Sequence, residues 1–197
     1  MNNDEIIKKL KSTLPLKRFL HSIGVADEAL NLAKKYHIDE QKAYSAGLLH
    51  DCAKYIQRDK AIDMLLESGE EVDEFQKKNS GLLHAPLGAV IAQNEYMVKD
   101  SQILDAIRNH TTGKANMSDL EKIIYLADLI EPGRNYLGID EIKKATYTNL
   151  NLGMLYGLEF SIKHVLSKKA VVHPKAIEAW NYICINNEED LYIERNR

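Results

Sequence analysis

The chain has 197 residues, of which 45% are hydrophobic, enough to build one sizeable core. Its formal net charge of −3 argues against a broad nucleic-acid-binding surface, which needs a strongly basic face. The two cysteines, Cys52 and Cys184, lack the spacing of a metal site or a disulfide framework, and this is typical of a reducing compartment. Since no apolar run approaches the roughly 18 residues of a membrane span, we expect one cytoplasmic globular domain over residues 1–197, with no membrane or nucleic-acid partner.

Apolar residues recur at intervals of three and four along most of the chain, a period typical of amphipathic helices. We therefore predict an all-α fold, a single helical bundle with a core of about 14–186 and a frayed, charged tail at 188–197. Ser118 and Glu121 form a capping-box pattern, and Pro132 with Gly133 ends the helix that follows. The predicted helices are one after Pro15 with a stripe at 16–33, one at about 40–51, three starting near Pro86, Ser101 and Ser118, and two longer ones at about 148–168 and 174–186.

Several ionisable residues fall on the apolar stripes of these helices. His50 lies on a face of small side chains, and Asp51 follows it at the helix end. His110 comes three residues after Ile107, and Asp128 belongs to the apolar run 123–128. An unpaired buried carboxylate costs several kcal/mol. We therefore expect these groups to meet one another, or to meet a cation.

Six residues from at least five segments make up the candidate metal set. Imidazole and carboxylate donors without a thiolate suit iron, manganese or zinc, and six are more than one catalytic ion with open positions needs. We therefore predict two metals. Adjacent helical residues point about 100° apart, so His50 and Asp51 are not expected to chelate one ion easily, whereas Asp51 can bridge a pair. The set is His21, His50, Asp51, His84, His110 and Asp128.

Each of these residues has a simpler interpretation when it is taken alone. A lone histidine on an apolar stripe is more often a hydrogen-bonded core residue than a ligand. Asp51 could cap its helix, and Asp128 could form a buried ion pair. Lys54 and Arg134 would normally be solvated. The joint occurrence of the histidines and aspartates favours a metal site. Beside such a site, the lysine and the forked guanidinium are suited to binding phosphate.

Five longer motifs carry a resemblance to a known family. They are Arg18-Phe-Leu-His21-Ser-Ile-Gly-Val25, Ala46-Gly-Leu-Leu-His50-Asp51-Cys-Ala-Lys54, His84-Ala-Pro-Leu-Gly88, His110-Thr-Thr-Gly113 and Ala127-Asp128-Leu-Ile-Glu-Pro-Gly-Arg134. In this order and at these spacings they resemble the HD superfamily, and within it the YqeK-type branch, the bacterial symmetrical bis(5'-nucleosyl)-tetraphosphatases. The similarity extends from about residue 14 to the helix that contains Trp180.

The resemblance implies a di-iron HD enzyme that cleaves diadenosine tetraphosphate (Ap4A) into two ADP molecules, with manganese and zinc as the alternative metals. The substrate partner is then a dinucleoside polyphosphate, and a homodimer is compatible with the sequence. The six residues above match the family's metal positions, and Asp51, Lys54 and Arg134 would be catalytic. The implied nucleotide contacts are Arg18, His21, Asp51, Cys52, Ala53, Lys54, His110, Thr111, Asp128, Arg134, Val171, Val172, His173, Pro174, Lys175 and Ala176.

Three other functions stay open at this point. An HD phosphohydrolase acting on nucleoside mono- or triphosphates would need the same metal ligands. A non-catalytic, metal-dependent nucleotide sensor would bind the ligand without turnover, although binding alone needs fewer metal groups. A helical interaction domain with buried histidine and aspartate networks would bind no metal.

Overall fold

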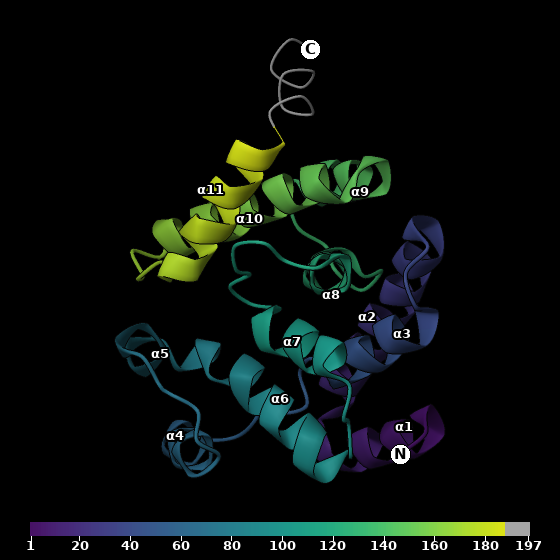
Figure 1. Ribbon diagram of the computed structural model, residues 1–197, viewed down its shortest axis with the longest axis vertical. Helices are drawn as coiled ribbons and strands as arrows, with labels where there is room; N and C mark the ends of the chain where they lie inside the picture. The colour runs from purple at the N-terminus through teal and green to yellow at the C-terminus, as the bar shows by residue number, and fades with distance from the viewer. Residues whose placement is uncertain (188–197) are drawn as a thin grey trace.

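The computed structural model describes residues 1–187, and over these residues the chain forms eleven α-helices, one short 3-10 helix and no strand (Figure 1). The predicted all-α fold is confirmed. The tail at 188–197, for which we predict fraying, lies outside the described residues. The elements are α1 (Asn3–Thr13), α2 (Leu16–Tyr36), α3 (Glu40–Leu49), α4 (Arg58–Glu67), α5 (Glu74–Lys78), η1 (Ser80–Leu82), α6 (His84–Glu95), α7 (Ser101–Asn109), α8 (Asp119–Ile130), α9 (Ile139–Thr148), α10 (Leu150–Ser167) and α11 (Pro174–Asn186).

Local signals in the sequence set the ends of the main helices. Helix α2 begins after Pro15 and ends at His37, whose φ of 55° is a left-handed cap. The predicted capping box is present at the start of α8, where the side chains of Ser118 and Glu121 each accept a hydrogen bond from the other residue's backbone amide. Pro174 opens α11, as predicted.

The structure also departs from the predicted helices at several points. Helices α1, α4, α5 and α9 are additions, and each has 11 residues or fewer, so only a few apolar positions mark its period. The helix predicted at 40–51 ends at Leu49. The helix predicted at about 148–168 is α10, which begins at Leu150 because the Asn149 side chain accepts hydrogen bonds from the amides of Asn151 and Leu152.

Helices α2, α3, α7 and α8 pack against one another and surround the candidate site (Figure 1). A Cβ atom added to Gly47 of α3 would lie only 2.7 Å from Cα of Ala26, so this glycine permits the close crossing of α2 and α3. Figure 1 shows α9, α10 and α11 above α8, and α4 and α5 beside α6. The crossing therefore brings the segment after α3 close to the first half of α2.

The buried hydrophobic residues of the described part form one cluster, which reaches from Ile6 to Ile183. This supports our prediction of a single domain, which stays a prediction for the whole of 1–197. Within the described residues, no helix has the length and apolar character needed to cross a membrane.

Candidate active site

The structure brings all six residues of the candidate metal set into one buried cluster. His21 comes from α2 and Asp128 from α8, whereas His84 is the first residue of α6. His50 and Asp51 follow α3 directly, and His110 follows α7. His50 is fully buried, and the exposed fractions of Asp51, His84 and His110 are 2%, 5% and 2%. Six residues that are spread over more than 100 positions of the chain therefore share one interior space.

Three of the four histidines are oriented by the same local hydrogen bond. Nδ1 of His50 lies 2.7 Å from the carbonyl oxygen of Gly47, three residues earlier. The same bond joins His84 to Gly81 at 2.6 Å and His110 to Ile107 at 2.7 Å. Because a carbonyl oxygen only accepts, each Nδ1 carries the proton, and the neutral imidazole keeps its lone pair on Nε2. Metal-bound histidines are commonly oriented in this way.

The Nε2 atoms of these histidines face one another in the centre of the cluster. Nε2 of His84 lies 3.0 Å from Nε2 of His110, and Nε2 of His50 lies 3.2 Å from Nε2 of His21. Two lone pairs at this separation repel, and a cation removes the repulsion. Two nitrogens that each lie about 2.1 Å from one ion, at right angles, are about 3.0 Å apart. The donor set therefore fits metal ions.

Asp51 lies between two groups of histidines and turns one carboxylate oxygen to each. Oδ2 is 3.4 Å from Nε2 of His50 and 3.8 Å from Nε2 of His21. Oδ1 is 3.0 Å from Nε2 of His84 and 3.7 Å from Nε2 of His110, and it is buried without a hydrogen-bond donor. A buried carboxylate oxygen that faces lone pairs is a good ligand for a cation. The arrangement suits a carboxylate that bridges two ions.

One expectation about this pair of residues is wrong. We expected His50 and Asp51 to point too far apart to share one ion, because we placed both on a regular helix. The helix ends at Leu49, and His50 keeps helical backbone angles. The two side chains nevertheless bring their ligand atoms to 3.4 Å, so that His21, His50 and Asp51 form one group able to hold an ion.

Three cationic side chains border the cluster. Nη1 of Arg18 is 2.5 Å from Oδ2 of Asp51, and Nζ of Lys54 is 3.5 Å from Oδ1. Arg134 bonds the Asp128 carboxylate through Nη2 and the Asp128 carbonyl oxygen through Nε, the latter at 2.8 Å. The side chains of Arg18, Lys54 and Arg134 are 24%, 33% and 36% exposed, so each touches a buried carboxylate and also reaches the solvent.

Burial opposes protonation of His50, but Asp51 and Asp128 outweigh it and raise the pKa of this imidazole. The surroundings of His84 and Asp128 favour the forms that bind cations. Burial, together with His110 and Lys54, lowers the pKa of His84 to about 4, so this imidazole is neutral at pH 7. Burial alone would raise the pKa of Asp128, but its contact with His21 and the nearby His50 and Arg134 side chains outweigh burial and lower that pKa. The carboxylate is therefore ionised and the imidazole is free to donate electrons.

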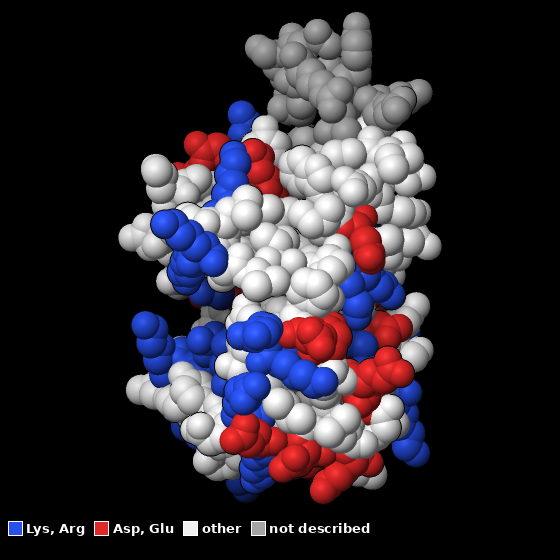
Figure 2. All heavy atoms as spheres, turned by 90° about the vertical axis from the view of Figure 1, so that its left-hand side faces the viewer, with Lys and Arg blue, Asp and Glu red and all other residues white. Residues whose placement is uncertain are grey.

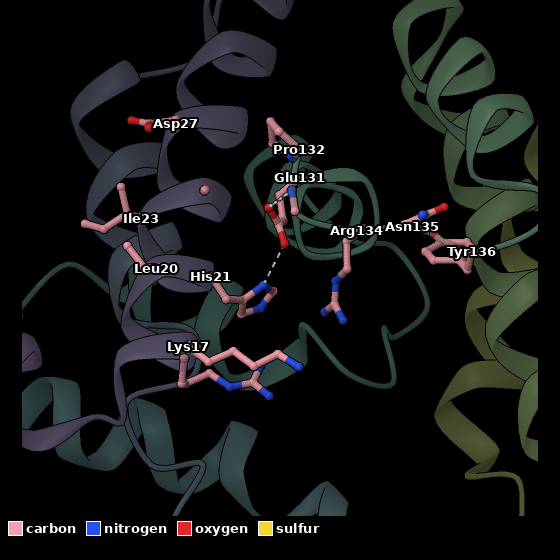
Figure 3. A pocket seen from close by; sticks show the side chains of 13 residues that line it. Lys17, Leu20, His21, Ile23, Asp27, Glu131, Pro132, Arg134, Asn135 and Tyr136 are labelled. Atoms are coloured by element: carbon pink, nitrogen blue, oxygen red, sulfur yellow. Dashed lines mark hydrogen bonds and ion pairs between the residues drawn. The ribbon is translucent and has the colours of Figure 1, made fainter.

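The predicted nucleotide contacts divide among three cavities around the cluster. Figure 3 shows the first, of about 710 Å³, which lies between α2 and the segment after α8 and is lined in part by Arg18, His21 and Arg134. A second cavity of about 320 Å³ is lined by Ala53, Lys54 and His84 among others. A third of about 260 Å³ includes Thr111, His173 and Lys175.

The third cavity lies on the side of the molecule where the α10–α11 turn meets α5. Nε2 of His173 is 2.9 Å from Oδ2 of Asp73, the residue that caps α5, and this contact joins the two segments. Figure 2 shows this side of the molecule, with a hollow at one edge that lysine and arginine side chains border. The lining of the third cavity carries both charges, since Arg108 and Lys175 lie beside Glu70, Glu71 and Asp73.

Some of the predicted nucleotide contacts are not brought to these cavities. The Cys52 thiol points to the carbonyl oxygen of Gly88, 3.5 Å away, so its side chain is turned aside. Val171, Val172, Pro174 and Ala176 line none of the three cavities, and Val171 is 48% exposed. Contacts from these positions to a nucleotide stay predictions.

Glu131 is a candidate functional residue that the sequence analysis missed. Its Oε1 lies 3.1 Å from Nδ1 of His21, and its Oε2 accepts a 2.5 Å hydrogen bond from the amide of Gly133 (Figure 3). A Cβ atom added to Gly24 would lie 2.6 Å from Oε2, and one added to Gly133 would lie 2.9 Å from it. Two glycines thus leave room for a carboxylate that orients His21. The sequence feature that could have indicated Glu131 is an acidic residue at the end of an apolar helix, directly before Pro132.

Comparison with known proteins agrees with this site. The HD domain family model matches residues 18–133, a span that contains all six candidate ligands. The chain is 34% identical over 183 residues to the Bacillus subtilis "Bis(5'-nucleosyl)-tetraphosphatase, symmetrical", with 93% of this chain and 98% of the relative covered. A protein of the same name from Halalkalibacterium halodurans is 36% identical over 188 residues, with 95% and 100% covered.

A solved structure shows the same fold. The chain is similar to a crystal structure from Clostridium acetobutylicum, described as a "predicted HD superfamily hydrolase involved in NAD metabolism", with a TM-score of 0.92 and 42% sequence identity. The match covers 95% of this chain and 99% of that one. The chain therefore belongs to the HD domain family, in its branch of symmetrical bis(5'-nucleosyl)-tetraphosphatases, and the resemblance noted in the sequence is confirmed.

Proposed function

We propose that this chain is a metal-dependent hydrolase that cleaves Ap4A symmetrically into two ADP molecules. The names of its relatives support the substrate and the symmetry of the cut. The observation that carries the chemistry is the placement of Asp51 between two pairs of Nε2 atoms, with Arg18 and Lys54 at its two oxygens. This arrangement combines a place for two cations with positive charge for a polyphosphate.

In this proposal, the six clustered residues hold the metals. His21 and His50 would bind on the Oδ2 side of Asp51, and His84 and His110 on the Oδ1 side. Asp128 would bind near His21, since its Oδ1 is 3.0 Å from Nε2 of that residue. When bound, the metal ions would supply a water of lowered pKa and Lewis-acid charge at phosphate oxygens.

The cations at the border would bind and orient the polyphosphate. Arg18, Lys54 and Arg134 already neutralise carboxylates in the cluster, and all three reach the solvent. Their charge would offset the negative charge that spreads over the phosphate oxygens in the transition state. Arg134 offers a planar fork of N–H donors for two oxygens of one phosphate. No protein nucleophile is needed, because water attacks phosphorus directly.

Symmetrical cleavage has a definite chemical signature. Attack of water on an inner phosphorus forms one P–O bond and breaks the central P–O–P bridge, so both products are ADP. In heavy-oxygen water, the label should enter the β-phosphate of one of the two ADP molecules. ATP together with AMP as products would show that an outer P–O–P bridge is broken and would contradict the proposal.

A substrate panel separates the alternatives. Preference for nucleoside mono- or triphosphates over Ap4A would favour the other HD phosphohydrolases. Binding of Ap4A by the metal-loaded protein without turnover would favour a sensor.

We also infer that the metals are iron, which the imidazole and carboxylate donors support, and that the protein is cytoplasmic, which its charge and cysteine content support. Elemental analysis of protein purified without added metal tests the first inference, and two equivalents of iron are expected. Cell fractionation tests the second.

A further inference from the structure

The four imidazole rings of the cluster follow one another in a row. The centroids of His84 and His110 are 4.9 Å apart, those of His110 and His50 are 5.1 Å apart, and those of His50 and His21 are 5.1 Å apart. The row therefore has two ends, one at His84 and one at His21.

Cavities adjoin both ends of this row, and one of the two at the His84 end, of about 320 Å³, is lined by His84 itself. Thr111, which follows His110, and Pro86, close to His84, line the cavity of about 260 Å³ that also contains His173. His21 lines the cavity of about 710 Å³. The row of rings thus has the cavity of about 710 Å³ at its His21 end and the two smaller cavities at its His84 end.

The proposed substrate also has a central reacting part with one group on each side. A symmetrical dinucleoside tetraphosphate carries one nucleoside at each end of four phosphates, and the cut falls in the middle. If the central bridge lies at the metal cluster, an extended substrate places its two nucleosides on opposite sides of it. The contacts implied for one nucleotide, at Thr111 and along the α10–α11 turn, account for only one of the two.

The cavity at the His21 end has the chemistry that a nucleoside with phosphates requires. Near the cluster it presents positive charge from Lys17, Arg18 and Arg134. Further along α2 it presents apolar surface from Leu20 and Ile23, and Leu20 is 57% exposed (Figure 3). An exposed leucine in a polar active-site cleft is a suitable contact for a base or a sugar.

The opposite wall of this cavity includes an aromatic ring that is held in place. The hydroxyl of Tyr136 donates a 2.9 Å hydrogen bond to the carbonyl oxygen of Leu129, and its ring stacks on Phe160 with centroids 4.4 Å apart. A ring that is fixed before binding costs little entropy when a ligand packs against it. The volume of about 710 Å³ also falls within the range of small-ligand sites, about 300–1,000 Å³.

We propose that the cavity between α2 and the segment after α8 binds the second nucleoside of the substrate, so that the two halves of Ap4A occupy different cavities on either side of the cut. This inference rests on the proposed function. The first nucleoside lies on the Thr111 and His173 side, and Leu20, Ile23 and Tyr136 contact the second.

The test compares a ligand that has two nucleosides with one that has a single nucleoside. The variant Leu20→Ser removes apolar surface from the cavity without adding charge. The matched control is Leu66→Ser, because Leu66 on α4 is also 57% exposed and lies outside this cavity. The two ligands are Ap4A, followed by its hydrolysis, and adenosine 5'-tetraphosphate, followed as a competitive inhibitor so that its own turnover is not needed.

Leu20→Ser should lower kcat/KM for Ap4A about tenfold, mainly through KM, as expected for lost apolar contact with a substrate. It should leave the inhibition constant of adenosine 5'-tetraphosphate within about twofold, because a single nucleoside takes the Thr111 side. Thr111→Val should weaken the binding of both ligands, and Leu66→Ser should weaken the binding of neither. Equal effects of Leu20→Ser on both ligands, or no effect on Ap4A, would overturn the inference alone. Wild-type protein that does not convert Ap4A to ADP would overturn the proposed function and this inference with it.

Discussion

Glu131 lies 3.1 Å from Nδ1 of His21, so one histidine of the candidate metal cluster is held by a carboxylate whereas His50, His84 and His110 are held by backbone carbonyl oxygens. A carboxylate makes the imidazole a more basic ligand than a carbonyl does, and such contacts commonly change metal affinity by about 10- to 100-fold. We therefore expect Glu131→Ala to weaken metal binding by about this factor. Metal content and a competition titration with a chelator measure the change.

Two further variants show whether orientation is the cause. Glu131→Gln keeps an oxygen that can accept a hydrogen bond from Nδ1 of His21, so this variant should lose less metal affinity than Glu131→Ala. Gly24→Ala leaves the carboxylate in the chain but places a Cβ atom 2.6 Å from Oε2, so it should also weaken binding. Normal metal affinity in Glu131→Ala would show that the contact has no effect on the site.

The position of Asp51 between the two groups of histidines leads to a second prediction. Asp51→Ala removes the atoms that face both groups, so we expect the variant to hold fewer than two equivalents of metal and to lose turnover of Ap4A. Elemental analysis and product formation are the measurements. A variant with the metal content and rate of the wild type would rule out the bridging assignment.

Arg134 provides a third prediction, which concerns phosphate recognition. Arg134→Lys keeps a positive charge near Asp128 but loses the planar fork, so we expect folding and metal content to be retained and kcat/KM for Ap4A to fall by about 10- to 100-fold. Circular dichroism and metal analysis are the controls. An unchanged kcat/KM would place this arginine outside the substrate contacts.

The contact between Asp73 and His173 leads to a prediction about pH. Burial opposes ionisation of Asp73, but hydrogen bonds from the Gln76 amide and from His173 outweigh it and lower its pKa. A lowered pKa in the folded state stabilises the fold above the unfolded value of about 3.9, and this contribution is lost as the pH falls through the folded pKa. Because asparagine also caps helices well, Asp73→Asn removes mainly the charge.

We therefore expect Asp73→Asn to lower Tm near pH 6 by at most about 2–4 °C, since a partly exposed pair contributes about 1 kcal/mol or less. The difference should shrink below about pH 4. Thermal melts over this pH range measure it, with Asp59→Asn as the control, because the Asp59 side chain is 90% exposed. A difference in Tm that persists unchanged at low pH would exclude the charge as its source.

His50, His110 and Asp128 could be found from the sequence because a buried ionisable group is costly, and such groups on apolar stripes stand out. The period marks His21 and His84 less clearly, since one borders a stripe and the other stands at a helix start. Glu131 escaped this reasoning, because an acidic residue at a helix end before a proline has the same pattern as a solvated one. The turn at His50 and Asp51 was also missed, since nothing in the apolar period distinguishes a helix that ends at Leu49 from one that ends two residues later. The capped starts of α8 and α11 were predictable because their signals are local.

The local hydrogen bonds of His50, His84 and His110 have a consequence for the chain as a whole. Each ring is fixed by a carbonyl oxygen three residues before it, so the ligand positions depend on how the helices are placed and not on the search for a side-chain rotamer. His21 and His50 are 29 residues apart, and His84 and His110 are 26 apart. Ions bound between such residues close loops of these lengths, as disulfides do, and restrict the unfolded chain accordingly. The bound metal cluster would thus also act as a cross-link between distant parts of the chain.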